Sequence, residues 1–194
     1  LVGSEMCIRD SISLYSVVFQ DFKIFSTTLA QNISTNEEYD KERLYDALDK
    51  ANIKDRVLKM ENKECTYLYK DLDKAGVEIS GGEAQKLALA RALYKDAPIV
   101  ILDEATAFAD PDNEVKIQKA LNELSKSKTV IMIAHRLSTV QNADCIYVLK
   151  DGRLIEQGKS GELCKQNGVF ATMLENYITS VSYTHLTLPT TSRV

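Results

Sequence analysis

The chain alternates between short, nearly continuous apolar runs and longer segments in which apolar residues recur at helical spacing. The short runs are rich in β-branched residues and predict strands at residues 14–20, 99–102, 129–134, 145–149 and 153–156. The periodic segments predict helices at residues 29–33, 41–58, 80–94, 113–124, from 138, 162–166 and 170–177. Strand and helix alternate after residue 98, which predicts an α/β fold with a mainly parallel sheet.

The pattern also suggests a domain organisation. Residues from about 28 to 96 are mostly helical and form an insertion before the alternating part. Residues 1–10 lack the apolar stretch of a signal peptide, and residues 181–194 are rich in Thr and Ser after a finished helix. Both ends resemble translated sequencing-adapter read-through, so we expect non-native tails around a partial domain at residues 11–180. Native tails are the alternative.

Composition narrows the class of protein. A chain of 194 residues suits one domain with a sizeable core. Its formal net charge of −4 argues against a nucleic-acid binder, which normally has a basic face. No apolar run reaches the ~18–20 residues that cross a bilayer, so we expect no membrane span in this segment.

Two acidic residues follow the strand at 99–102. Ligands of open α/β sheets bind at the carboxyl ends of the strands. An acid at that edge can hold Mg²⁺, and a second acid can orient and deprotonate a hydrolytic water. We therefore identify Asp103 as the candidate magnesium ligand and Glu104 as the candidate general base. The alternative is a turn that ends the strand with two solvated acids.

The residues Ser80-Gly81-Gly82-Glu83 open the helix at 80–94 and fit a Ser-x-x-Glu capping box. Capping boxes are common and need no ligand. Two glycines just inside a helix are costly for a simple cap, however, because each disfavours the helix by up to ~1 kcal/mol. They leave N–H groups accessible at the positive end of the helix dipole, which suits a phosphate.

Several motifs in a fixed order resemble the ATP-binding cassette (ABC) ATPase family. The resemblance is carried by Gly76-Val77-Glu78-Ile79-Ser80-Gly81-Gly82-Glu83 with Gln85, Leu87, Ala88, Ala90 and Arg91-Ala92-Leu93, by Ile99-Val100-Ile101-Leu102-Asp103-Glu104, and by Ile133-Ala134-His135-Arg136. It implies a P-loop NTPase-like sheet with a helical subdomain insertion, incomplete at the N-terminus. Glu83 stands where the family more usually has Gln, and we expect it to point away from the phosphate as the capping partner.

The resemblance assigns further roles. In this family the signature motif at Ser80, Gly81 and Gly82 binds the γ-phosphate of ATP held by a partner subunit. His135 is similar to the switch histidine that contacts the γ-phosphate, although a lone His is more often structural. Gln20 resembles the Q-loop glutamine that reaches Mg²⁺ and senses the transmembrane partner. Asp110 matches the D-loop acid between the two sites, where Phe108 and Ala109 are atypical.

One family motif does not occur in these 194 residues. The Walker A loop, Gly-x-x-x-x-Gly-Lys-Ser/Thr, supplies the main grip on the β- and γ-phosphates. The sequence Gly158-Lys159-Ser160 is not this loop, because Arg153 occupies the place of the first Gly. In the family Walker A lies upstream of the Q-loop, so we expect this chain to be a truncated fragment that alone neither binds ATP tightly nor hydrolyses it.

The tail from Ala134 to Gly158 looks like the exporter branch of the family. This resemblance implies an ATP- and Mg²⁺-dependent ATPase that powers transport from the cytoplasmic face of the cell membrane. Its partners are a second nucleotide-binding domain, in a homo- or heterodimer, and a transmembrane domain on the same polypeptide. That domain's coupling helices contact the helical insertion, with Gln20 at the hinge. The alternatives are a Walker-A-less partner subunit, which contributes only a signature face, and a soluble ABC-type ATPase.

Overall fold

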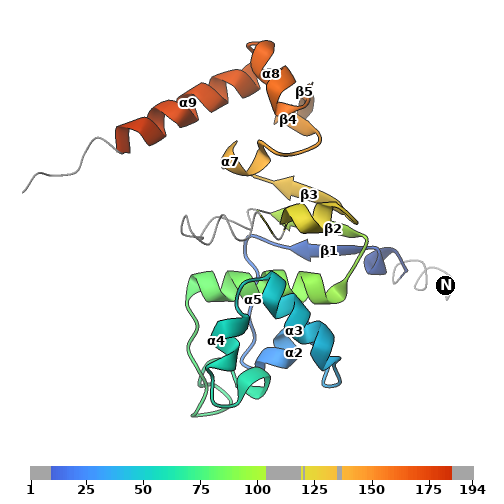
Figure 1. The fold of residues 1–194 in the computed structure, drawn as a ribbon, viewed down its shortest axis with the longest axis vertical. Coiled ribbons are helices and arrows are strands. Elements are labelled where there is room, and N and C mark those ends of the chain that lie inside the picture. Colours follow the sequence, from blue (N-terminus) through green and yellow to red (C-terminus); the bar gives the residue numbers. More distant parts are fainter. Residues whose placement is uncertain (1–9, 104–118, 120, 135–136, 185–194) are drawn as a thin grey trace, which may run out of the picture. The chain divides into compact units, whose positions relative to one another are not determined.

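The computed structural model describes residues 10–103, 119, 121–134 and 137–184. The chain divides into two compact units, residues 1–133 and 134–194. The first unit contains, in chain order, β1 (Tyr15–Val18), α2 (Leu29–Ser34), α3 (Lys41–Lys50), α4 (Lys54–Leu58), the short 3-10 helix η1 (Lys63–Cys65), α5 (Gly81–Lys95), β2 (Ile99–Asp103) and β3 (Thr129–Ile133). Figure 1 shows these elements and those of the second unit.

Three parallel strands form the sheet of the first unit, in the order β1–β2–β3. Val18 of β1 lies opposite Leu102 of β2, and Asp103 lies opposite Ile133 of β3. The three carboxyl ends therefore meet at one edge of the sheet. The predicted α/β fold with a parallel sheet is confirmed.

Helix α5 covers one face of this sheet. Its buried residues include Leu87, Leu89 and several alanines, whose small side chains let neighbouring elements approach closely. The Ser16 hydroxyl of β1 donates a hydrogen bond to the Ala92 carbonyl of α5 (3.1 Å). On the other side of α5 lie α2 and α3, so the helix runs between the sheet and the remaining helices (Figure 1). The core of the first unit is centred on this helix.

The opposite face of the sheet is apolar but more exposed. Val100 and Leu102 of β2 are buried towards α5, whereas the alternate residues Ile99 and Ile101 are half-buried. On β3 the exposed fractions of Ile131 and Ile133 are 49% and 51%. Parallel sheets are normally covered on both faces, so the described residues of the first unit provide only part of the cover that this sheet needs.

The prediction of a single helix at residues 41–58 is wrong, because the structure has two helices there, α3 and α4. Asn52 adopts the left-handed conformation (φ 55°), and the Ile53 amide donates to the Leu48 carbonyl (3.0 Å). This is the arrangement of a Schellman C-cap, in which Asn is one of the residues that tolerate a positive φ. The apolar pattern continues through the break, since Ala51, Ile53 and Val57 are all buried.

The second unit contains α7 (Leu137–Val140), β4 (Ile146–Lys150), β5 (Arg153–Gly158), α8 (Ser160–Lys165) and α9 (Val169–Thr184). The predicted hairpin is confirmed: β4 and β5 are antiparallel, and both turn residues, Asp151 (φ 51°) and Gly152 (φ 73°), have the positive φ of a type I′ turn. Leu163 and Phe170 are buried in its core. Helix α9 is longer than the helix predicted at residues 170–177, since it runs from Val169 to Thr184. None of the described helices is both long and apolar enough to cross a membrane.

A buried carboxylate joins α3 to η1. The Glu64 side chain is only 6% exposed, and its two oxygens accept separate bonds, from Lys41 Nζ (2.5 Å) and from the Tyr45 hydroxyl (2.5 Å). Burial alone would raise the pKa of Glu64. The hydrogen bonds from Lys41 and Tyr45 outweigh burial and lower the pKa from 4.5 to about 2. The charged form of Glu64 therefore stabilises the helical part of the first unit.

The substitution Glu64→Gln should lower the free energy of unfolding by about 2 kcal/mol at pH 7. Because the folded-state pKa is lowered, this contribution is present above pH 4.5 and is lost as the pH falls towards about 2. Denaturant unfolding of both proteins across this range checks the result. Glu123→Gln, which removes an exposed pair with Lys126, is the control and should cost less than about 0.5 kcal/mol. A pH-independent difference would contradict the assignment.

Candidate functional site

The start of helix α5 has the capping geometry that the sequence predicts. Ser80 is extended (φ −72°, ψ 160°), and its hydroxyl oxygen accepts a hydrogen bond from the Glu83 amide (3.2 Å). In return, Glu83 Oε2 accepts from the Ser80 amide (2.9 Å). Both halves of the capping box are present. The box fixes the direction in which the first turn of α5 points.

Between these capping residues lie Gly81 and Gly82. The first N–H groups of a helix have no partner within the helix, and here they lie at the positive end of the dipole. Gly81 is exposed, its φ is not positive, and a Cβ built on it would meet nothing within 4 Å. Neither packing nor backbone conformation in the described residues therefore requires glycine at 81. A ligand that approaches the backbone closely would require it.

Gly76, five residues earlier, has the opposite character. A Cβ on Gly76 would lie 1.7 Å from the Tyr69 carbonyl oxygen, so no side chain fits there without a backbone shift. The close approach is part of a small bridge in which the Tyr69 amide donates to the Val77 carbonyl (3.0 Å), and the Val77 amide donates to the Tyr67 carbonyl (2.9 Å). Gly76 thus shapes the loop that leads into Ser80.

A cleft of about 530 Å³ opens beside the start of α5. It brings together the segment that follows Gln20, the loop before the signature and the first turn of α5. Its lining residues are Phe22, Lys23, Ile24, Ser26, Tyr69, Asp71, Gly81 and Ala84. The structure therefore places the signature glycine next to the segment that continues from Gln20, although these parts are about 60 residues apart in the sequence.

A hydrogen-bonded clamp holds the same segment to α5. Arg91 of α5 donates through Nε to the Asn32 carbonyl (2.7 Å) and through its terminal nitrogen to the Lys23 carbonyl (3.1 Å). Its guanidinium lies 5.8 Å from the centre of the Phe25 ring. Burial lowers the pKa of Arg91, but arginine stays charged in proteins.

The buried side chain of Asn32 completes the clamp. Its oxygen accepts from the Phe25 amide (2.8 Å), and its nitrogen donates to the Phe25 carbonyl (2.9 Å). The same nitrogen reaches the Thr27 hydroxyl (3.1 Å) and the Thr28 carbonyl (3.1 Å). The segment from residue 23 to residue 28 is therefore fixed to α2 and α5 together.

The candidate magnesium ligands lie at the carboxyl edge of the sheet. Asp103 is the last residue of β2 and is half-buried, and Gln20 is exposed two residues beyond the end of β1. The strand register places these two chain positions at the same edge. In the part of the chain that the structure describes, no three His, Cys, Asp or Glu side chains converge on a metal site. Glu104, Asp110 and His135 lie outside the described residues.

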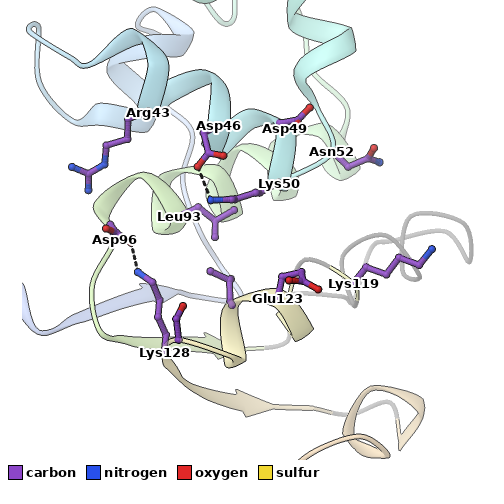
Figure 2. Close-up of a pocket in the computed structure, with 12 residues that line it drawn as sticks. Arg43, Asp46, Asp49, Lys50, Asn52, Leu93, Asp96, Lys119, Glu123 and Lys128 are labelled. Carbon is purple, nitrogen blue, oxygen red and sulfur yellow. Dashed lines mark hydrogen bonds and ion pairs between the residues drawn. The ribbon is translucent and has the colours of Figure 1, made fainter.

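A larger pocket lies elsewhere. It measures about 810 Å³ and is lined by α3, the C-terminal end of α5 and the residues before β3. Figure 2 shows that its charges are mixed and partly paired with one another, Lys128 with Asp96 and Lys50 with Asp46. Asp96 and Lys128 precede β2 and β3, so this pocket is at the amino edge of the sheet. Ligands of such sheets bind at the other edge.

Comparison with known proteins identifies the family. Residues 6–107, more than half of the chain, match the sequence model of the ABC transporter family. The chain belongs to the ABC transporter family.

The chain is 43% identical over 168 residues to the ATP-dependent lipid A-core flippase of Salmonella paratyphi A, and 41% identical over 167 residues to that of Burkholderia pseudomallei (strain 1710b). Each alignment covers 86% of this chain but only 28% or 27% of the flippase. A solved structure of a bacterial Atm1-family ABC exporter with ATP bound is also similar, with a TM-score of 0.77 and 32% identity. That match covers 85% of this chain and 29% of the exporter. The fold is that of an exporter's nucleotide-binding domain.

The sequence alone does not assign a role to Arg91 or Asn32. Arg91 lies within the motif that carries the family resemblance, but nothing in its spacing indicates which carbonyls it reaches. Asn32 lies in a predicted helix among Leu29, Ala30 and Ile33, all of which are buried. A polar amide within such an apolar group was the signal that could have identified it, because a buried amide needs partners.

The two glycines on either side of Ser80 should respond oppositely to alanine. Gly81→Ala should leave the free energy of unfolding unchanged or raise it by up to about 1 kcal/mol, because the site is open and Ala favours a helix. Gly76→Ala should lower it by about 2 kcal/mol or more through the clash with Tyr69. Denaturant unfolding measures both. Equal destabilisation by the two substitutions would mean that Gly81 is structural.

Proposed function

We propose that this chain is part of the nucleotide-binding domain of an ABC exporter, which binds ATP with Mg²⁺ and hydrolyses it to drive transport across a membrane. The proposal rests mainly on the geometry of the first turn of α5. Ser80, Gly81 and Gly82 present accessible backbone at a helix N-terminus, and packing does not explain the glycine at 81. In a member of the ABC transporter family, that arrangement supports phosphate binding.

The signature turn acts on ATP held by a second nucleotide-binding domain. Ser80 offers its hydroxyl, and Gly81 and Gly82 offer N–H groups to the γ-phosphate, which carries the negative charge that the helix dipole favours. The exposure of Ser80 and Gly81 supports contact with a partner rather than with the chain's own interior. Asp110 would connect the two sites of the dimer.

The residues at the sheet edge would bind the metal and activate water. Mg²⁺ prefers oxygen ligands, keeps several waters and needs only one or two protein carboxylates besides the phosphates. The Asp103 carboxylate and the Gln20 side-chain oxygen fit that requirement, since their chain positions share one edge. When bound, the ion would offset charge on the phosphates. Glu104 would take the proton from the attacking water, and His135 would contact the γ-phosphate.

The cleft at the start of α5 would receive the coupling helices of a transmembrane domain on the same polypeptide. Phe22, Ile24, Tyr69 and Ala84 give it an apolar part next to the signature turn, and Lys23, Ser26 and Asp71 give it a polar part. The clamp of Arg91 and Asn32 supports coupling between the cleft and the signature turn. A movement of residues 23–28 would act on α5 through Arg91 and on α2 through Asn32. The domain would then lie at the cytoplasmic face of the membrane and dimerise with an equal or similar domain.

The first test is Glu104→Gln in the full-length protein. If Glu104 is the general base, kcat for ATP hydrolysis should fall at least about 100-fold while ATP binding is retained. Phosphate release and equilibrium nucleotide binding measure the two properties. Glu123→Gln is a matched control, because Glu123 is an exposed carboxylate in the amino-edge pocket. Hydrolysis that survives Glu104→Gln would refute the assignment of the base.

The second test concerns the 194-residue chain by itself. Because it lacks the Walker A loop, we expect neither ATP binding in the micromolar range nor hydrolysis above background. Isothermal titration with Mg-ATP and a phosphate-release assay check this, once circular dichroism has confirmed folding. Robust hydrolysis that depends on Glu104 would show that another part of this chain binds the β- and γ-phosphates.

A further inference from the structure

The first turn of α5, where Ser80, Gly81 and Gly82 would bind phosphate, also contains an acidic residue, Glu83. Glu83 is the third residue of α5, and hydrogen bonds from Ser80 and Arg56 lower its pKa although burial opposes this, so the carboxylate is ionised at neutral pH. A carboxylate at a helix N-terminus satisfies the dipole. For the same reason it competes electrostatically with an anionic ligand at that terminus. A phosphate site with this residue needs a way to limit the repulsion.

Arg56 provides the opposite charge. Its Nε lies 2.8 Å from Glu83 Oε1, while Glu83 Oε2 accepts the bond from the Ser80 amide. Each carboxylate oxygen therefore has its own donor, and neither needs to turn towards Gly81 or Gly82. The two residues are 27 positions apart, so the contact is set by the fold and not by helical spacing.

The position of Arg56 is defined by the core. It belongs to α4, and its neighbour Val57 is fully buried among the apolar residues of the first unit. The side chains of Arg56 and Glu83 are 44% and 26% exposed. Because Arg56 lies beside Glu83, its charge can act both on Glu83 and on an anion bound at the first turn of α5, and salt should weaken this effect because the pair is partly exposed.

We propose that Arg56 is a positioning residue of the signature site: it holds Glu83 in the cap and neutralises it, so that the first turn of α5 can accept the γ-phosphate of ATP. This inference rests on the proposed function. It also gives a reason why the chain can use Glu where the family pattern more usually has Gln. The dependence on Arg56 should exist only while residue 83 carries a charge.

The requirement for a charge at residue 83 distinguishes a role of Arg56 in the phosphate site from a purely structural role. Exposed ion pairs contribute little to folding, and a pair that merely joins α4 to α5 would act on stability alone. A glutamine at position 83 can still close the capping box, because a neutral amide also accepts from the Ser80 amide. Removing the charge at 83 should therefore remove the need for Arg56 without removing the cap.

The experiment is a double-substitution cycle in the full-length protein, with Arg56→Gln, Glu83→Gln and the two together. Steady-state hydrolysis gives kcat and KM for ATP. We expect Arg56→Gln to raise KM about fivefold when Glu83 is present and by less than twofold in the Glu83→Gln background. Arg56→Lys should restore most of the loss, and higher ionic strength should reduce the difference. Lys54→Gln is the matched control: it removes a cation of α4 that pairs with Asp49 instead, and KM should not change.

Equal effects of Arg56→Gln in the parent protein and in the Glu83→Gln background would overturn the proposal, and so would no effect in either. A loss of kcat alone would also contradict it, because the proposed role is in binding. If Arg56→Gln unfolds the domain, the same cycle is made with Arg56→Met, which keeps the apolar stem of the side chain and removes its charge, and the same criteria apply. Failure of the proposed function would appear differently, as hydrolysis that survives Glu104→Gln. The two ideas can therefore fail separately.

Discussion

The arrangement of the first unit depends on the burial of helix α5 between the sheet and the other helices. Its small, alanine-rich faces let β1 approach from one side and α2 and α3 from the other. A helix packed in this way cannot tilt without opening the core, since interiors are close-packed. Its N-terminus, in contrast, reaches solvent at Ser80 and Gly81. The core thus fixes the direction of a turn that is itself accessible to a ligand.

Polar contacts then connect this turn to the rest of the unit. The capping box orients its backbone, Arg56 neutralises its acidic residue, and the clamp of Arg91 and Asn32 fastens residues 23–28 to the same helix. The segment after Gln20 and the first turn of α5 are therefore connected through the same helix. In the proposed function the cleft beside α5 would bind a second protein segment, and the first turn of α5 would bind a phosphate.

Local rules predicted a large part of this structure. The capping box at Ser80, the strands predicted at residues 99–102 and 129–134, to within one residue of their ends, and the turn at Asp151 and Gly152 all follow from residues adjacent in sequence. The break at Asn52 was missed, because the apolar pattern continues through it and only the left-handed backbone reveals it. The Arg91–Asn32 and Arg56–Glu83 contacts span 59 and 27 residues. Periodicity says which face is buried, but it does not say which distant donor meets which acceptor.

In the proposed dimer, the first turn of α5 binds ATP that is held by another domain. Disulfide crosslinking can detect this contact, with Ser80→Cys and a second cysteine in the phosphate-binding loop of the full-length protein, whose other cysteines are removed. We expect a crosslink between two domains that forms with ATP when Glu104→Gln blocks hydrolysis, and that weakens without nucleotide. A crosslink within one domain, or a yield that does not depend on ATP, would contradict it.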